Sequence, residues 1–218
     1  MPFTTVIVHP LVEGADINDS TNRAHVALRT FFDKIKQEDG FLGYFVGMQV
    51  QNPNILEAVI NWEDSSKYNL WKASPEYGSV NKELSSIFTS EGEVYEAALT
   101  LEPHGESLKV FAAPLTEIVR FYFEGEAPST YLDDFKKAGD KLREDGVQGV
   151  VAVAGGITHE EHEHNGVKGK VATVVVGWES LEHHMEFLKS ETMQETSVLL
   201  RSTSKAIKFH HVKFSLVG

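Results

Sequence analysis

The chain has 218 residues, of which 41% are hydrophobic and 24% charged, a globular composition that excludes fibrous and disordered classes. Its 20 basic and 32 acidic residues give a net charge of −12, which makes nucleic acids and acidic membranes poor partners. There is no cysteine, so disulfides, thiol catalysis and cysteine-ligated metal centres are excluded. No apolar run reaches the ~18 residues that span a membrane. The first ten residues lack the basic region and apolar core of a secretory signal, so we expect no such signal and a cytoplasmic protein.

The first half of the chain predicts strands and helices in the order βαββαβ. β-Branched runs indicate the strands, a 3/4 spacing of apolar residues indicates the first helix, and capping or turn residues separate the elements. The expected strands cover 4–8, 41–50, 55–62 and 94–101; the expected helices run from a cap at Asn18, Asp19 or Ser20 to Gly40, from Asp64, and from Pro75.

The segment 102–108, which contains Pro103 and Gly105, is predicted to be a linker. The second half then repeats the order of the first, so we place one unit at 1–101 and another at 109–218. Its expected strands cover 117–123, 147–157, 170–178 and 205–216, and its helices begin with a cap at Ser129 and run from about Ser180 to Ser202.

A gapless internal repeat supports this duplication. The segment WEDSSKYNLWKAS begins at Trp62, and WESLEHHMEFLKS begins 116 residues later at Trp178. Each half therefore has the ferredoxin-like βαββαβ order. Because apolar residues alternate on both faces of the predicted strands, we expect an α+β fold in which two tandem ferredoxin-like repeats form an intramolecular pseudo-dimeric barrel. Two copies of this barrel could in turn form a homodimer.

The repeated motif, a strand followed by Trp-Glu-x-x-x-x-aromatic-x-x-aromatic-x-x-Ser, resembles the antibiotic biosynthesis monooxygenase-like (ABM) group of the dimeric α+β barrel superfamily. Each half is similar to one subunit of that group. The superfamily also holds stress-responsive barrel proteins, polyketide cyclases and haem-degrading monooxygenases. The resemblance implies the barrel fold and, in the first half, an aromatic-rich pocket wall.

Two of these subfamilies are disfavoured at the positions of their functional residues. Where the haem-degrading members have the axial histidine, this chain has Asn81 and, in the second half, Ser197, which are not haem ligands. The cyclases use a tyrosine and a histidine where this chain has Trp71 and Tyr77. No glycine-rich phosphate loop is present either, so we expect no cofactor.

The first half supplies most of the candidate site. His9, at the end of the first strand, could act as a base or be a surface histidine. Tyr68 and Trp71 could form a stacking wall for a flat apolar ligand, and Tyr77 and Asn81 could donate hydrogen bonds to an enolate or phenolate oxygen. The alternative for the aromatic residues is an ordinary core between helix and sheet.

The second half supplies weaker candidates. Arg120 either faces a pocket or lies at one of the alternating strand positions that face solvent, and we favour the exposed position. His184 could line a second pocket or be solvated. His159, His162 and His164 carry metal-binding chemistry, but they precede Asn-Gly at a hairpin tip, where the supporting shell of a metal site is rare. We therefore predict no metal and keep these three as weak candidates.

Two functions remain open. The leading one is a cofactor-independent monooxygenase- or cyclase-like enzyme acting on a small aromatic or polyketide-type compound, with His9, Tyr77 and Asn81 as catalytic residues and Tyr68, Trp71, Arg120 and His184 as substrate-binding residues. The alternative is a non-catalytic small-molecule-binding or stress-responsive barrel protein.

Overall fold

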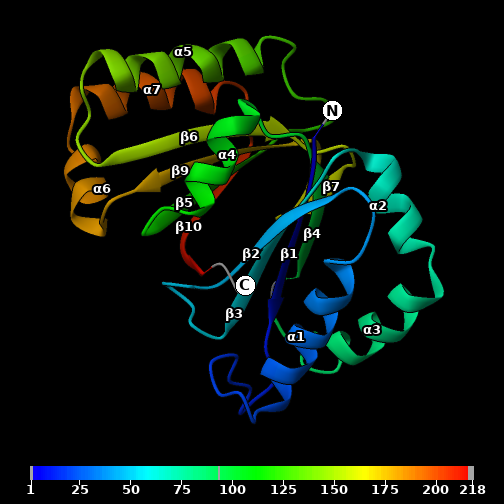
Figure 1. Ribbon diagram of the computed structural model, residues 1–218. Coiled ribbons are helices and arrows are strands. Elements are labelled where there is room, and N and C mark those ends of the chain that lie inside the picture. The colour runs from blue at the N-terminus through cyan, green and yellow to red at the C-terminus, as the bar shows by residue number, and fades with distance from the viewer. Residues whose placement is uncertain (1, 93, 216–218) are drawn as a thin grey trace.

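The computed structural model describes residues 2–92 and 94–215, and its first half contains the predicted βαββαβ unit (Figure 1). Asn22, rather than the expected Asn18, Asp19 or Ser20, caps the first helix by accepting a hydrogen bond from the backbone of Ala24. The elements are β1 (Phe3–Pro10), α1 (Arg23–Ile35), β2 (Phe41–Gln49), β3 (Ile55–Trp62), α2 (Ser65–Lys72), α3 (Pro75–Ser85) and β4 (Tyr95–Leu99).

The second half has the same order with an added hairpin. Its helix caps repeat those of the first half, because Asp64 and Ser74 cap α2 and α3 while Ser180 and Ser190 cap the corresponding helices. The predicted last strand reached Leu216, which lies outside the described residues. The elements are β5 (Leu115–Tyr122), α5 (Tyr131–Glu144), β6 (Val150–Ile157), β7 (His162–His164), β8 (Val167–Gly169), β9 (Val171–Trp178), α6 (Leu181–Phe187), α7 (Glu191–Arg201) and β10 (Ala206–Ser215).

The strands of both halves form one eight-stranded sheet in the order β4-β1-β3-β2-β10-β5-β9-β6. The halves join through β2 and β10, where Gln49 lies opposite Val212. At the other edge, Glu102 and Gly155 exchange two backbone hydrogen bonds of 2.9 Å. The sheet therefore curls and closes on itself, which confirms the α+β pseudo-dimeric barrel.

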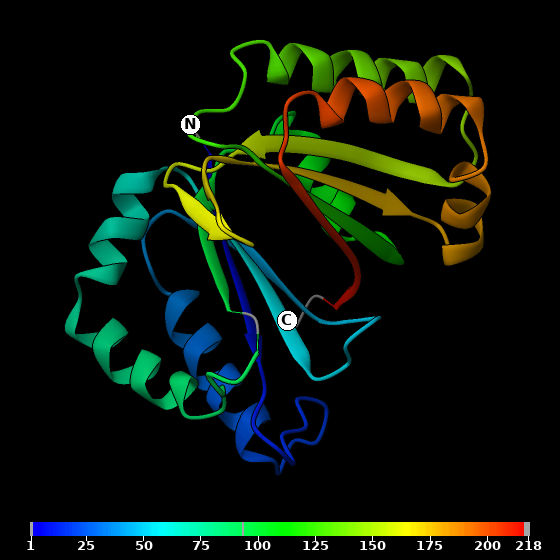
Figure 2. The ribbon, with the colours of Figure 1, turned by 180° about the vertical axis from the view of Figure 1, so that it is seen from behind.

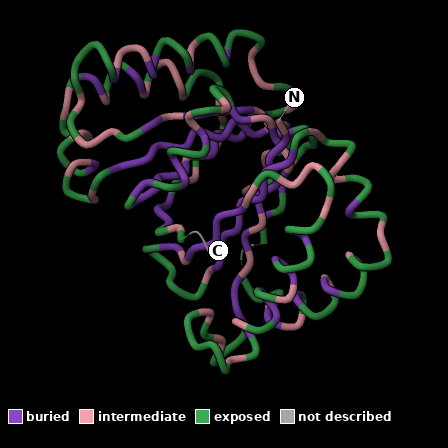
Figure 3. Tube along the Cα trace, viewed as in Figure 1, coloured by how far each residue is buried: buried purple, intermediate pink, exposed green. Residues whose placement is uncertain are grey.

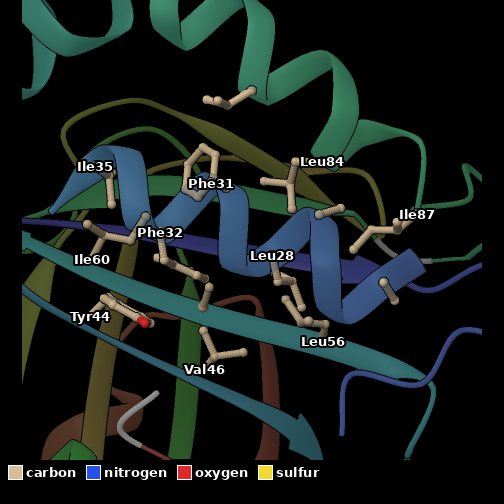
Figure 4. Close-up of a cluster of buried hydrophobic side chains, with 14 of the residues drawn as sticks. Leu28, Phe31, Phe32, Ile35, Tyr44, Val46, Leu56, Ile60, Leu84 and Ile87 are labelled. Carbon is tan, nitrogen blue, oxygen red and sulfur yellow. The ribbon is translucent and has the colours of Figure 1, made fainter. Parts of the chain in front are cut away.

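Each half covers the outer face of its part of the barrel with its own helices. Figures 1 and 2 show α1, α2 and α3 on one side of the molecule and α5, α6 and α7 on the other. The buried positions follow the strands and the inner faces of these helices (Figure 3). In the first half, Phe31, Phe32 and Ile35 of α1 pack on Tyr44 and Ile60 of the sheet (Figure 4). None of the helices in the described ranges is long and apolar enough to cross a membrane.

The predicted linker 102–108 differs from the structure, because most of it belongs to a helix, α4 (His104–Phe111). Pro103 precedes the first turn, where its missing N–H is not needed. Val110 and Phe111 at the end of α4 are buried in the barrel core with residues of both halves. The connection between the repeats therefore also helps to fill the barrel. The boundaries of the two units themselves stay a prediction.

Candidate functional site

A cavity of about 550 Å³ lies between the sheet and the helices of the first half. It brings together five residues that the sequence analysis selected, from three elements: His9 of β1, Tyr68 and Trp71 of α2, and Tyr77 and Asn81 of α3. The repeat motif places the aromatic residues there, because the spacing after Trp62 puts them on successive turns of α2 and α3, on the side of each helix that faces the sheet.

The wall of this cavity is aromatic. The ring of Trp71, which is 2% exposed, meets the ring of Tyr77 edge to face at 5.6 Å. Tyr68 lies 6.0 Å from Trp62 and 5.4 Å from Phe3, centroid to centroid. Such a wall accepts a flat apolar ligand. Burial raises the pKa of Tyr77, so its phenol stays protonated at neutral pH and can donate a hydrogen bond.

His9 is paired with a carboxylate at the edge of the cavity. Its Nε2 lies 2.7 Å from Oε1 of Glu96 on β4, and its ring stacks on Phe88 at 4.6 Å. The hydrogen bond from His9 lowers the pKa of Glu96, which remains ionised. When Nε2 donates to Glu96, the other ring nitrogen, Nδ1, is the proton acceptor. A base oriented by a carboxylate is a common catalytic arrangement. Glu96 could not be predicted from the sequence, because only the pairing of β1 with β4 brings it to His9.

The second half also contributes to this cavity. His159 and Glu160, which follow β6, line it. Their position is fixed by backbone pairing: the amide of His159 donates to the carbonyl of Ala98, and Oε1 of Glu160 accepts from the amide of Ala98, both at 2.8 Å. The ring of His159 lies 5.2 Å from that of Phe3. This contribution could not be predicted from the sequence, because only closure of the barrel brings Glu160 next to Ala98, 62 positions earlier in the chain.

His159, His162 and His164 do not come together as a metal site. The Asn-Gly tip is confirmed, with positive φ at Asn165 and Gly166, as a two-residue hairpin turn requires. The rings separate, however: His162 packs on Tyr95 at 4.9 Å and His164 on Tyr122 at 4.6 Å, while His159 faces the first cavity. The hairpin is therefore packed against the barrel, and its imidazoles do not converge on one point.

Arg120 lies inside the barrel, which corrects the expectation that it is exposed. It is 1% exposed, and its Nη2 donates to Oε1 of Glu57 at 2.9 Å. Nε2 of His210 lies 2.6 Å from the other oxygen of Glu57, and the Arg120 guanidinium covers the ring of Tyr95 at 4.0 Å. Arg120 lines neither the first cavity nor the second, so the structure does not bring it to the other predicted substrate-binding residues.

His184 lies in the second half, at 2% exposure, and lines a separate cavity of about 180 Å³. Glu117 of β5 and His211 of β10 lie beside it, and one ligand-type atom from each of the three residues falls within 4.8 Å of the others. They are the described residues best able to hold a metal ion. The sequence did not reveal this group, because β5, α6 and β10 are brought together only by the sheet.

The comparisons with known proteins agree on the fold. No family model and no curated protein matches the sequence. Among solved structures, the chain superposes on an anthrone oxidase-like protein with a TM-score of 0.65, 11% identity, and 98% of this chain and 91% of the other covered. It matches a "putative monooxygenase" of Fusobacterium nucleatum with a TM-score of 0.61, 12% identity, and coverage of 100% and 95%. A "putative monooxygenase" of Lactobacillus acidophilus follows, with a TM-score of 0.58, 11% identity, and coverage of 98% and 93%. The chain therefore has the fold of proteins named as monooxygenases.

Proposed function

We propose that this protein is a cofactor-independent, monooxygenase-like enzyme that acts on a small aromatic or polyketide-type compound bound in the first cavity. The observation that carries the proposal is the convergence of His9, Tyr77 and Asn81 with the aromatic wall in one cavity of about 550 Å³. That volume falls within the range of small-molecule sites. A likeness to proteins named as monooxygenases and as anthrone oxidase-like supports the choice of chemistry.

The proposed reaction begins with proton removal by His9. Nδ1 takes a proton from an activated CH₂ group of the substrate, and the carboxylate of Glu96, 2.7 Å from Nε2, stabilises the imidazolium that forms. The electron pair stays on the substrate as an enolate or phenolate, whose oxygen accepts hydrogen bonds from the Tyr77 phenol and the Asn81 amide.

The electron-rich substrate then reduces dioxygen directly. One oxygen atom enters the product as a carbonyl and the other leaves as water with the two hydrogens of the CH₂ group, so the step balances without a separate reductant. The cavity residues contribute by holding the flat ring system and by keeping the negative charge on the substrate oxygen.

Oxygen uptake with anthrone as the probe tests this proposal in the full-length protein. We expect uptake above the uncatalysed rate, reduced about 100-fold by His9→Ala and about 10-fold by Tyr77→Phe, in line with the size of base and hydrogen-bond-donor effects. His104→Ala, at the start of α4, is the control and leaves the rate unchanged. Full turnover in both cavity variants would rule out these roles. Binding of anthrone without any uptake would instead favour the non-catalytic binding protein.

A further inference from the structure

The second half has its own cavity at the position that corresponds to the first, but with different chemistry. β1 pairs Phe3 with Trp62 and β5 pairs Leu115 with Trp178, so Glu117 corresponds to Thr5. The repeat register makes His184 the counterpart of Tyr68. Further substitutions in the second cavity are Phe187 for Trp71, Met193 for Tyr77 and Ser197 for Asn81.

The wall of the second cavity is almost entirely apolar. Its volume is about 180 Å³, and it is lined by residues from both the sheet and the helices, including Phe121, Leu142, Val174, Phe187, Leu200 and Phe209. Phe209 is 62% exposed, which places it at an opening to solvent. Because a dry cavity of ~150 Å³ in another protein accepts benzene, this space suits a molecule with one aromatic ring and a short apolar tail.

A polar cluster contributes to the wall of this largely apolar cavity through Glu117 and His184. Oε2 of Glu117 accepts the indole N–H of Trp178 at 3.1 Å, and Oε1 lies 3.3 Å from Nε2 of His184. Nδ1 of His184 lies 3.0 Å from Nε2 of His211. The side chain of Glu117 is 12% exposed against 2% for His184, so Glu117 is the member of the cluster that a ligand reaches.

The hydrogen-bond partners of His211 determine which nitrogen atoms of His211 and His184 carry protons. The side-chain oxygen of Gln51 accepts the backbone N–H of His211 at 2.9 Å, so its nitrogen donates to Nδ1 of the same ring at 2.7 Å. The proton of His211 is then on Nε2 and is donated to Nδ1 of His184. The proton of His184 is therefore on its Nε2, which lies 3.3 Å from Oε1 of Glu117 without forming a hydrogen bond to it. Both tautomers are thereby set, and the protonated Nε2 of His211 opposes metal coordination at that atom. Glu117 remains an acceptor with unused lone pairs.

We propose that the second cavity is a binding site for a small phenol or aryl alcohol, whose ring fills the apolar space and whose O–H donates to Glu117. A carboxylate acceptor in the wall of a largely apolar cavity selects a neutral ligand that carries one hydrogen-bond donor. This site is distinct from the one proposed for oxygenation and does not depend on it.

The tryptophan indoles allow the site to be located in the unmodified protein. The chain has three tryptophans, and only Trp178 donates to Glu117, whereas Trp62 and Trp71 line the first cavity. On titration with 4-propylphenol in ¹H–¹⁵N correlation spectra, we expect the indole signal of Trp178 to shift in a saturable way. A shift confined to Trp62 and Trp71 would place the phenol in the first cavity and overturn the proposal.

Calorimetry with matched probes tests the role of Glu117. We expect 4-propylphenol to bind at least about 10-fold more tightly than its methyl ether, 4-propylanisole, which has the same shape but no donor. Glu117→Gln reduces this preference to below about 3-fold, and Ala138→Leu, which fills the cavity, weakens both probes. Circular dichroism verifies the fold of both variants. Equal affinity of the two probes in the wild type would overturn the proposal, as would one-to-one Zn²⁺ binding that displaces the phenol.

Anthrone turnover keeps the two proposals separable. Tyr77→Phe changes only the first cavity, so it leaves the 4-propylphenol titration of Trp178 unchanged. Ala138→Leu changes only the second cavity and leaves oxygen uptake with anthrone unchanged.

Discussion

At the scale of single residues, Glu57 is the most unusual group in the barrel. It is fully buried; burial by itself would raise the pKa of its carboxyl, but Arg120 and His210 outweigh this effect and hold the pKa below its usual range. Glu57 is therefore ionised in the interior, where Arg120 binds one of its oxygens and His210 and Gln49 bind the other. A buried ion pair contributes little net stability when intact, but it is costly to break on one side.

Glu57→Gln leaves Arg120 buried without its counter-charge. We expect the free energy of unfolding, measured in urea, to fall by about 3–5 kcal/mol. Asp140→Asn removes a carboxylate from an exposed pair with Arg143 and changes the same free energy by less than about 0.5 kcal/mol. Similar small losses for both variants would mean that water reaches Glu57.

His162 gives the stability a dependence on pH. Burial lowers its pKa below the ordinary value of 6.5, so between the folded and unfolded pKa values the unfolded chain binds more protons. Stability is then complete above about pH 6.5 and decreases as the pH falls below it. Burial also lowers the pKa of His211, which gives stability the same dependence on pH.

His162→Phe keeps a ring against Tyr95 but removes the titrating group. We expect the decrease in unfolding free energy from pH 7.5 to 5.5 to be smaller in this variant, because its unfolded chain no longer binds the proton that burial disfavours in the folded state. Urea unfolding at both pH values measures the difference. An unchanged decrease would assign the effect to other groups such as His211.

At the scale of elements, two glycines illustrate opposite requirements. Gly78 lies within α3, and a Cβ added there meets no atom within 4 Å. Gly149 precedes β6 with φ of +78°, and a Cβ there would lie 2.3 Å from the ring of His183. We expect Gly78→Ala to raise the free energy of unfolding by about 0.5–1 kcal/mol. Gly149→Ala should lower it by more than that; the reverse order in urea unfolding would contradict this account.

Helix α4 offers a second test, because the sequence analysis assigned most of it to a linker. Phe111 is 1% exposed and lies 5.6 Å from Phe45, whereas Leu108 in the same helix is 40% exposed. Phe111→Ala should cost about 3–5 kcal/mol of unfolding free energy, and Leu108→Ala should stay within about 0.5 kcal/mol. A small effect of Phe111→Ala would mean that α4 connects the two repeats without stabilising the barrel.

At the scale of the whole molecule, the barrel interior makes the two repeats interdependent. Its core contains Val59 from the first half and Val175 and Val212 from the second. We expect one cooperative unfolding transition, seen together by tryptophan fluorescence and far-ultraviolet circular dichroism. Val59→Ala and Val175→Ala should each lower the free energy of unfolding for this shared transition by about 2 kcal/mol. Two transitions, each moved by only one variant, would show that the halves unfold separately.

The sequence by itself determined the repeat, the order of the elements and the aromatic residues that line the first cavity. These depend on short-range patterns: the caps at Asp64 and Ser74 recur at Ser180 and Ser190, and the spacing after Trp62 places Trp71 and the following aromatics on one side of their helices. Such features lie within a few turns of each other, where periodicity and capping preferences predict structure well.

Only the tertiary structure decided the surroundings of the polar residues. In a closed barrel both faces of a strand are buried, so alternation cannot tell the interior from the helix-covered side, and this ambiguity explains the error on Arg120. The pairs His9–Glu96, Glu57–Arg120 and His184–His211 join residues 87, 63 and 27 positions apart. Strand order and barrel closure set these contacts, and local sequence patterns carry no information about either.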